Sequence, residues 1–243
     1  MTNSTNDTIW QSAQVAYNFL DNVRGGIPLA GEQIDVMLRV IRAACPSIER
    51  FLDVGCGDGI MGRAVLMQYP SAQGVFLDFS EPMIEAAKAK TSGSHTFITQ
   101  DYGTVEWLKT VEAHAPFDAI VSGFSIHHQP DARKRELYRE LFHLLKPGGV
   151  FLNLEHVAPE NQWVETLFDE IMVDTLYAHN QRSGTGKSRE QVAAEFHARA
   201  DKDANILAPV ETQCHWLRDI GFSDVDCYLK IFELALFGGR RPA

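Results

Sequence analysis

Short apolar runs alternate with amphipathic segments through the middle of the chain. Five runs have the length and composition of buried strands, at residues 51–55, 72–78, 95–101, 118–123 and 150–155. The segments between them carry apolar residues at every third or fourth position, which is typical of helices that bury one face. This alternation predicts an α/β fold, in which a mostly parallel sheet has helices on both faces.

Two flanking regions break the alternation. Residues 1–49 are predicted to be mainly helical, with a Gly- and Pro-rich loop at 24–31. After the last of the five runs, the pattern indicates a helical insertion over 158–208 and then, over 209–243, one helix and two more strands, giving a seven-stranded sheet. We expect a single domain with its core at 50–157. The insertion is expected to cap the carboxyl edge of the sheet, where open α/β sheets bind ligands.

The chain of 243 residues carries a formal charge of −10, and 45% of its residues are hydrophobic. These values suit one large globular domain. Because an acidic surface repels phosphate backbones, we expect no nucleic-acid partner. The densest basic cluster, at 132–139, lies in a segment with apolar residues at helical spacing and is predicted to be a solvated helix face.

The cysteines and the start of the chain bear on its location. The four cysteines show neither a C-x-x-C pair nor the spacing of a disulfide framework. The first residues are polar, and no apolar run reaches the ~18–20 residues of a membrane span. We therefore expect reduced thiols, no membrane association and a cytoplasmic location.

A glycine-rich turn follows the first strand. In "LDVGCGDG", Gly55, Gly57 and Gly59 stand at every second position after Asp53, and glycines let a backbone approach a ligand closely. The second glycine also begins a match to the dinucleotide pattern G-x-G-x-x-G, but Asp58 inside the turn would repel a pyrophosphate. S-adenosylmethionine has no phosphate, and its α-ammonium group could donate a hydrogen bond to Asp53. The turn therefore favours S-adenosylmethionine over a dinucleotide.

Acidic residues end the next two strands. Asp78 ends the second strand and could bind both ribose hydroxyls, as it also could in a dinucleotide site. Phe79 and Met83 could pack on the adenine, and Asp101, followed by Tyr102, could accept from the adenine amino group. Each residue alone is weak evidence because aspartate also caps helices. Three acids at successive strand ends predict a nucleoside site.

The chain resembles the class I S-adenosylmethionine-dependent methyltransferases. The resemblance rests on "LDVGCGDG", "LDFSEPM", "TQDY", "FDAIVSGFSIHH" and "LLKPGGVFLNLE", and it covers roughly residues 45–157. It implies a Rossmann-like methyltransferase fold with S-adenosylmethionine as the cofactor. It also implies cofactor contacts from the glycine turn with Cys56, from the strand-end residues above, and from Ser122 and Gly123 at the end of the fourth strand.

A narrower likeness covers the flanking regions. "FLDNVRGGIP", "LFDEIM" and the segment from "PVETQCHW" onward are similar to the carboxy-S-adenosylmethionine synthase branch. That likeness implies a homodimer, expected here through 158–208, and a modified cofactor held by an arginine of the inserted helices. Arg199 is a loose counterpart of that arginine, and the first turn of the branch usually differs from "GCGDG".

The methionine tail of the cofactor ends in a carboxylate, which needs a cation because it would otherwise be buried beside an acid. Arg24, in the loop at 24–31, is the candidate, with Tyr17 about two turns earlier on the same predicted helix. The alternative for Arg24 is a surface position at a helix C-terminus, where the helix dipole favours it.

Four residues after the fourth and fifth strands are candidate catalytic bases: His127, His128, Glu155 and His156. Methyl transfer needs a base only when the nucleophile carries a proton, and histidine suits the task because its ordinary pKa is about 6.5. Each of the four could instead be structural. Because neighbours on an extended chain point to opposite sides, we do not expect the adjacent histidines to share a metal ion.

Aromatic residues of the insertion allow two interpretations. Trp163, Phe168, Tyr177 and Phe196 could form a lid over an organic acceptor, but at helical spacing such residues more often form a core. We expect methyl transfer to a small molecule. The alternatives are a carboxy-S-adenosylmethionine synthase-like transfer to the sulfonium, or a non-catalytic protein that binds S-adenosylmethionine.

Overall fold

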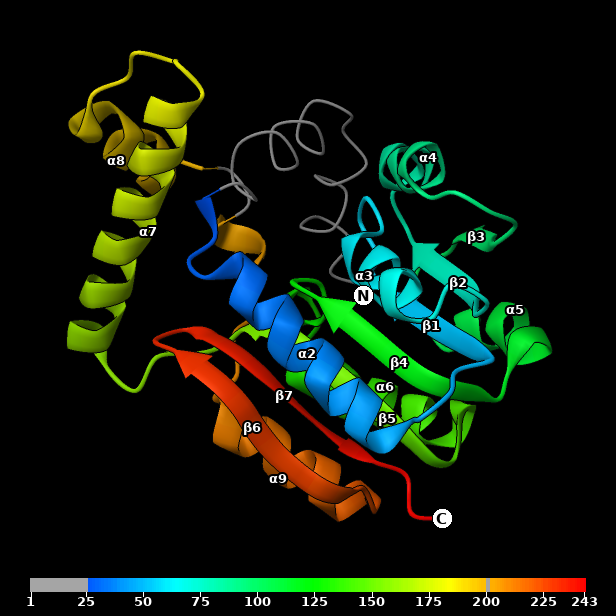
Figure 1. The fold of residues 1–243 in the computed structure, drawn as a ribbon. Helices are drawn as coiled ribbons and strands as arrows, with labels where there is room; N and C mark the ends of the chain where they lie inside the picture. Colours follow the sequence, from blue (N-terminus) through cyan, green and yellow to red (C-terminus); the bar gives the residue numbers. More distant parts are fainter. Residues whose placement is uncertain (1–25, 200–201) are drawn as a thin grey trace.

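A seven-stranded sheet in the order β3-β2-β1-β4-β5-β7-β6 runs through residues 26–199 and 202–243, which the computed structural model describes. Strands β1 to β5 pair in parallel, and β7 is antiparallel to both β5 and β6. The strands are β1 (Arg50–Val54), β2 (Gln73–Asp78), β3 (Thr96–Thr99), β4 (Phe117–Gly123), β5 (Leu145–His156), β6 (Ser223–Ile231) and β7 (Leu234–Arg240). The predicted fold class is confirmed (Figure 1).

Helices cover both faces of this sheet (Figure 1). One face packs against α2 (Ala30–Ala44), α3 (Ile60–Gln68) and α4 (Glu81–Lys90). The other packs against α5 (Trp107–Val111), α6 (Asp131–Leu144) and α9 (Val210–Ile220). Short 3-10 helices lie at Glu112–His114, Ile126–His128 and Lys202–Ala204. The two packed layers fix the carboxyl ends of the parallel strands, where the candidate site residues follow. No helix of the described part of the chain is long and apolar enough to cross a membrane.

The fifth strand begins earlier than its apolar run. The apolar run predicts that this strand begins at 150, after the Pro and Gly residues of "KPGG", but β5 already begins at Leu145. Gly148 and Gly149 are held by backbone hydrogen bonds to Arg241, both at 2.8 Å. The chain that follows β7 therefore extends the pairing of the sheet over a segment whose Pro and Gly residues suggested a turn.

The basic cluster on α6 is partly buried, so the prediction of a solvated face is wrong for two of its residues. Lys134 is fully buried, and its ammonium group donates to Asp131 and to the carbonyl of Ile206. Arg133 is 8% exposed and donates to the carbonyl of Tyr102. Both cations anchor neighbouring segments to α6.

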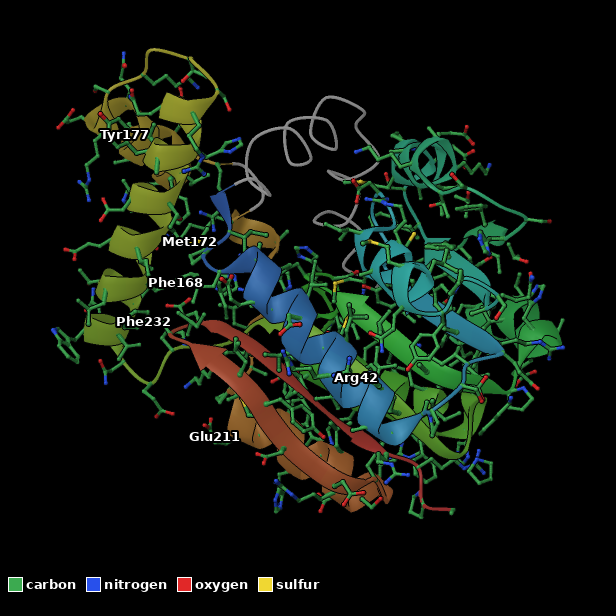
Figure 2. All side chains as sticks on the ribbon, in the orientation of Figure 1. Arg42, Phe168, Met172, Tyr177, Glu211 and Phe232 are labelled. Carbon is green, nitrogen blue, oxygen red and sulfur yellow. The ribbon has the colours of Figure 1, made fainter. Side chains whose placement is uncertain are left out.

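The insertion forms a helical cap beside the sheet, made of α7 (Gln162–Arg182) and α8 (Arg189–His197) (Figure 1). Phe168, Met172 and Phe196 share a small core with Leu234 of β7. Figure 2 shows Phe168 and Met172 on the side of α7 that faces the rest of the fold. The predicted boundaries of the insertion meet at its base, where the backbone N–H of Ala158 donates to the carbonyl of Ala208 (3.1 Å).

Candidate functional site

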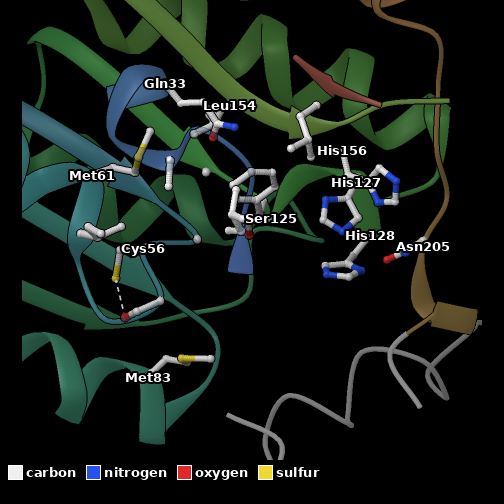
Figure 3. Close-up of a pocket in the computed structure, with 18 of the residues that line it drawn as sticks. Gln33, Cys56, Met61, Met83, Ser125, His127, His128, Leu154, His156 and Asn205 are labelled. Carbon is white, nitrogen blue, oxygen red and sulfur yellow. Dashed lines mark hydrogen bonds between the residues drawn. The ribbon is translucent and has the colours of Figure 1, made fainter. Parts of the chain in front are cut away.

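A cavity that is partly open to solvent lies at the carboxyl edge of the sheet under the cap (Figure 3). Its walls come from the loops after β1, β2 and β4, from the end of β5, from α2, and from the cap. The predicted residues that line it are Gly55, Cys56, Gly57, Asp78, Phe79, Met83, Gly123, His127, His128 and His156.

The glycine turn after β1 has the backbone that its sequence predicts. Gly55, Gly57 and Gly59 have φ angles of 63°, 54° and 79°, in the left-handed region that other residues adopt at a cost. Around Gly57, an added Cβ atom would meet one described atom within 4 Å, Sδ of Met83 at 3.9 Å. The turn therefore presents bare backbone to the cavity.

Asp78 lies beside this turn and is 7% exposed. Its Oδ2 accepts from the backbone N–H of Gly57, and its Oδ1 accepts from that of Ser80, both at 2.9 Å. Burial raises the pKa of Asp78 to about 6 against these two hydrogen bonds. A carboxylate with further acceptor positions, between bare glycine backbone and the side chains of Phe79 and Met83, suits the ribose and adenine of S-adenosylmethionine.

Asp58, which we expected to repel a pyrophosphate, is paired instead. Its carboxylate lies 2.9 Å from Nζ of Lys90 and 3.6 Å from a guanidinium nitrogen of Arg63. The residue is 3% exposed and does not line the cavity. Repulsion by this carboxylate is therefore not what favours S-adenosylmethionine over a dinucleotide.

Several predicted residues lie near the cavity without lining it. Asp53 is fully buried, and its Oδ2 accepts from the backbone N–H of Gly62 (2.8 Å) at the start of α3. Asp101 is exposed and accepts from the N–H of Gly103 within its own turn. The others outside the lining are Gly59, Tyr102, Ser122 and Glu155, and Tyr17 and Arg24 lie outside the described residues.

The adjacent histidines face the cavity together, contrary to our expectation. His127 and His128 belong to the short 3-10 helix after β4 instead of an extended segment, and their ring centres are 4.0 Å apart. His128 also contacts the carbonyl of Ala204 through Nδ1 (3.1 Å). Within the described residues, no group of three or more His, Cys, Asp or Glu side chains is arranged to hold a metal ion.

His127, in the cavity wall, forms a buried pair with Glu155 behind it. Nδ1 of His127 lies 2.5 Å from Oε1 of Glu155, and the backbone N–H of His127 donates to Oε2 (3.0 Å). Burial raises the pKa of Glu155 to about 7. Burial also holds the pKa of His127 well below its ordinary value, although the side chain of Asn205 opposes this by hydrogen bonding to it. A lowered pKa favours the neutral imidazole, which is the form that can accept a proton.

A second pair of the same kind was missed from the sequence. Nε2 of His156 lies 2.8 Å from Oε2 of Glu233, which is 3% exposed in the turn between β6 and β7. A single glutamate between two terminal strands gave no signal, because only the antiparallel insertion of β7 next to β5 brings it to this edge. Reasoning from the sequence also missed Gln33, Phe124, Ser125 and Asn205, which line the cavity from α2 and from loops.

The aromatic residues of the cap have different positions. Phe168 and Phe196 line the cavity and also belong to the core of the cap, so the two interpretations are compatible for them. Tyr177 packs against that core, and Trp163 is 71% exposed. Arg199 lines the cavity with its guanidinium 4.2 Å from the ring centre of Phe196.

Comparison with known proteins gives three kinds of match. Residues 51–149 match the family model described as a methyltransferase domain. A carboxy-S-adenosyl-L-methionine synthase of Pseudoalteromonas translucida is 23% identical over 221 residues, which are 88% of this chain and 86% of that protein. An uncharacterized methyltransferase of Bacillus subtilis is 33% identical over 185 residues, which are 75% of this chain and 66% of that protein.

The solved structures agree at the level of the fold. Human N-acetylserotonin methyltransferase, in complex with S-adenosylmethionine, superposes with a TM-score of 0.63 at 15% identity and covers 100% of this chain. This chain spans 61% of that longer one. The matched domain, the relatives and the fold agree with the motifs of the sequence. The chain belongs to the class I S-adenosylmethionine-dependent methyltransferases, with a more distant likeness to the carboxy-S-adenosylmethionine synthases.

Proposed function

We propose that this protein transfers a methyl group from S-adenosylmethionine to a hydroxyl oxygen of a small apolar molecule, with His127 as the base. The observation that carries this proposal is the pair of His127 and Glu155. The imidazole lines the cavity, and its Nδ1 lies 2.5 Å from a buried carboxyl group. A neutral histidine held in one orientation is the arrangement that proton abstraction needs.

The cofactor supplies an electrophilic methyl group on a sulfonium that leaves as a neutral thioether. Gly57 and Asp78 would hold its nucleoside, with Phe79 and Met83 beside the adenine. His127 would take the proton of the acceptor hydroxyl as the oxygen forms its bond to the methyl carbon, while the carbon–sulfur electron pair goes to sulfur. Glu155 would stabilise the imidazolium that results. The cap would exclude water from the reacting atoms.

The proposed acceptor class is supported by the lining of the cavity on the side of the cap. Phe168, Met172 and Phe196 present apolar side chains there, next to the three histidines. Among the described lining residues, the carboxylate belongs to Asp78, on the nucleoside side. An apolar molecule with a hydroxyl group fits this wall better than a cationic amine, which would call for a facing carboxylate.

The test is methyl transfer from labelled S-adenosylmethionine to a panel of phenols and apolar alcohols. Replacement of the base, His127→Ala, is expected to lower the rate by about 10²–10⁴-fold while S-adenosylhomocysteine still binds. His197→Ala, at an exposed position of α8, is the matched control and is expected to have no effect. Full activity of the His127 variant would refute the role of the base.

A second candidate is carboxy-S-adenosylmethionine synthase-like chemistry, the activity named for the Pseudoalteromonas relative. The observation that favours it is Arg199 in the cavity wall, as a cation for a carboxylate attached to the methyl carbon. Mass spectrometry of the copurifying ligand would separate plain from carboxylated cofactor. If the carboxylated form binds, Arg199→Ala should abolish its binding and spare S-adenosylmethionine, whereas Arg189→Ala, in an exposed ion pair with Asp174, should affect neither.

We also propose a homodimer built through the cap and a cytoplasmic location. The dimer is supported by the exposure of Trp163, 71%, at the start of α7. The location is supported by the cysteines, all four of which are free thiols.

A further inference from the structure

Gln33, on α2, is one of the buried polar side chains of the cavity wall. The residue is 1% exposed and lines the cavity together with its neighbours Ala30 and Ile34. Its Nε2 donates to the carbonyl of Pro28 at 2.7 Å, which fixes the side chain against the loop before α2. Figure 3 shows the Gln33 amide on the same side of the cavity as Leu154 and across it from Met83.

The carboxamide oxygen of Gln33 has no partner among the described residues. Because a backbone carbonyl can only accept, the amide nitrogen of Gln33 must face Pro28. Oε1 must therefore point away from Pro28. In that position Oε1 is buried and forms no hydrogen bond within the described part of the chain. A buried acceptor without a donor is costly, and most such atoms in proteins have a partner. A bound ligand can supply that donor.

The cofactor has a donor that needs such a partner. Its methionine end carries an α-ammonium group with three N–H donors, and burial of this charge requires acceptors. Asp53, the acceptor expected from the sequence, is fully buried, accepts from the N–H of Gly62 through Oδ2 and does not line the cavity. Asp78 lies at the nucleoside end, and Oγ of Ser125 is bonded to the hydroxyl of Tyr102 (2.5 Å). Gln33 remains as a lining acceptor away from both the nucleoside end and the histidines.

We propose that Oε1 of Gln33 accepts a hydrogen bond from the α-ammonium group of the cofactor. The inference rests on S-adenosylmethionine as the cofactor and not on the acceptor or on the role of His127. It makes α2, a helix outside the glycine turn and the strand ends, part of the cofactor site. It also gives the loop at Pro28 a function, because this loop orients the carboxamide.

The experiment compares two ligands that differ in the tail. S-adenosylhomocysteine has the ammonium and carboxylate groups, and 5′-methylthioadenosine lacks both. Calorimetry is expected to show that Gln33→Met weakens S-adenosylhomocysteine roughly tenfold or more, as for loss of a hydrogen bond to a charged group, and leaves 5′-methylthioadenosine within about twofold. Retained binding of the tailless ligand also demonstrates that the variant is folded.

Gln33→Glu is the second variant. It keeps an acceptor for the ammonium group but loses the donor to Pro28, so the affinity for S-adenosylhomocysteine should be kept or increased. Equal losses for both ligands in Gln33→Met, or no loss for either, would overturn the inference. So would weakening of S-adenosylhomocysteine by Gln33→Glu as large as that by Gln33→Met. Failure of the wild type to bind either ligand would instead refute the cofactor assignment on which the inference rests.

Discussion

Oγ of Ser125 lies 1.8 Å from the point that a Cβ atom on Gly55 would occupy. The two residues therefore touch only because Gly55 has no side chain. The same hydroxyl is hydrogen-bonded to that of Tyr102 (2.5 Å), and Ser125 begins the segment that carries His127. This contact couples the glycine turn after β1 to the loop after β4, so that the cofactor side and the proposed base share one fixed junction.

The junction predicts that Gly55→Ala is more destabilising than an alanine at another left-handed glycine. Gly186, in the cap, has φ 70° and no neighbour within 4 Å of an added Cβ atom, so Gly186→Ala is the matched control. The control should lower the free energy of unfolding by about 1 kcal/mol through backbone strain alone. Gly55→Ala should cost about 1–3 kcal/mol more, because Ser125 must move. Equal values in urea titrations would refute the junction.

Asp78 predicts a pH dependence of ligand binding. Its pKa is raised to about 6 by burial, and hydroxyl donors from a ribose would favour its ionised form. Binding of S-adenosylhomocysteine should therefore release a proton near pH 6, and the affinity should rise between pH 5 and pH 7. Asp78→Asn should weaken binding by about 1.5–3 kcal/mol and remove this dependence. Calorimetry in buffers of different ionisation enthalpy measures the proton release, and a flat wild-type profile would contradict the assignment.

Glu155 predicts a pH dependence of stability with the opposite sign to that of a salt-bridged carboxylate. Its pKa is about 7 in the folded protein and 4.5 as the ordinary value, so the folded state keeps a proton that the unfolded state loses. The contribution of Glu155 alone to the free energy of unfolding should thus fall by about 2–3 kcal/mol as pH rises from about 5 to 7. The lowered pKa of His127 contributes with the opposite sign, so the wild type must be compared with a Glu155 variant. Glu155→Gln cannot ionise and should show a shallower slope. Parallel curves for the two proteins would show that Glu155 does not titrate in this range.

The proposed homodimer predicts a light-scattering mass of about twice the 27.2 kDa of one chain at micromolar concentration. Trp163→Asp should lower that mass, because it places a charge on the exposed apolar position of α7. Met67→Asp is the control, since Met67 is 87% exposed on α3, outside the cap. A mass near that of one chain for the wild type would exclude the dimer at this concentration.

The strands and the nucleoside end of the cavity were predictable because each depends on local sequence. Period and composition indicate strands, and a carboxylate at a strand end lies at the sheet edge whatever the rest of the chain does. Asp53 shows the limit. The residue stands where predicted, but its carboxylate is bonded to the N–H of Gly62 at the start of α3. The motif places the carboxylate at the strand end, but packing decides whether it accepts from a backbone N–H of α3 or from a ligand.

The rest of the cavity, where the acceptor and the methionine tail of the cofactor would lie, was less predictable because it depends on segments far apart in the chain. His127 was identified, but its partnership with Glu155 arises from the neighbouring positions of β4 and β5. Glu233 reaches His156 through the antiparallel strand β7. Gln33 comes from a helix that precedes the whole sheet. For each of these residues, the informative fact is which strands and helices are neighbours, and that is a property of the topology.

The hydrogen bond between Ala158 and Ala208 means that the chain leaves the sheet for the cap and returns to it at one point. Next to this point, Val157 donates to the carbonyl of Glu233, and Ile206 donates to that of His127 (2.9 Å). Both ends of the cap are thus fastened to the part of the molecule that would carry out the chemistry, whatever lies between them. Replacing α7 and α8 by other helices would therefore change the shape of the acceptor space. The nucleoside end, the sheet and the histidines would keep their positions.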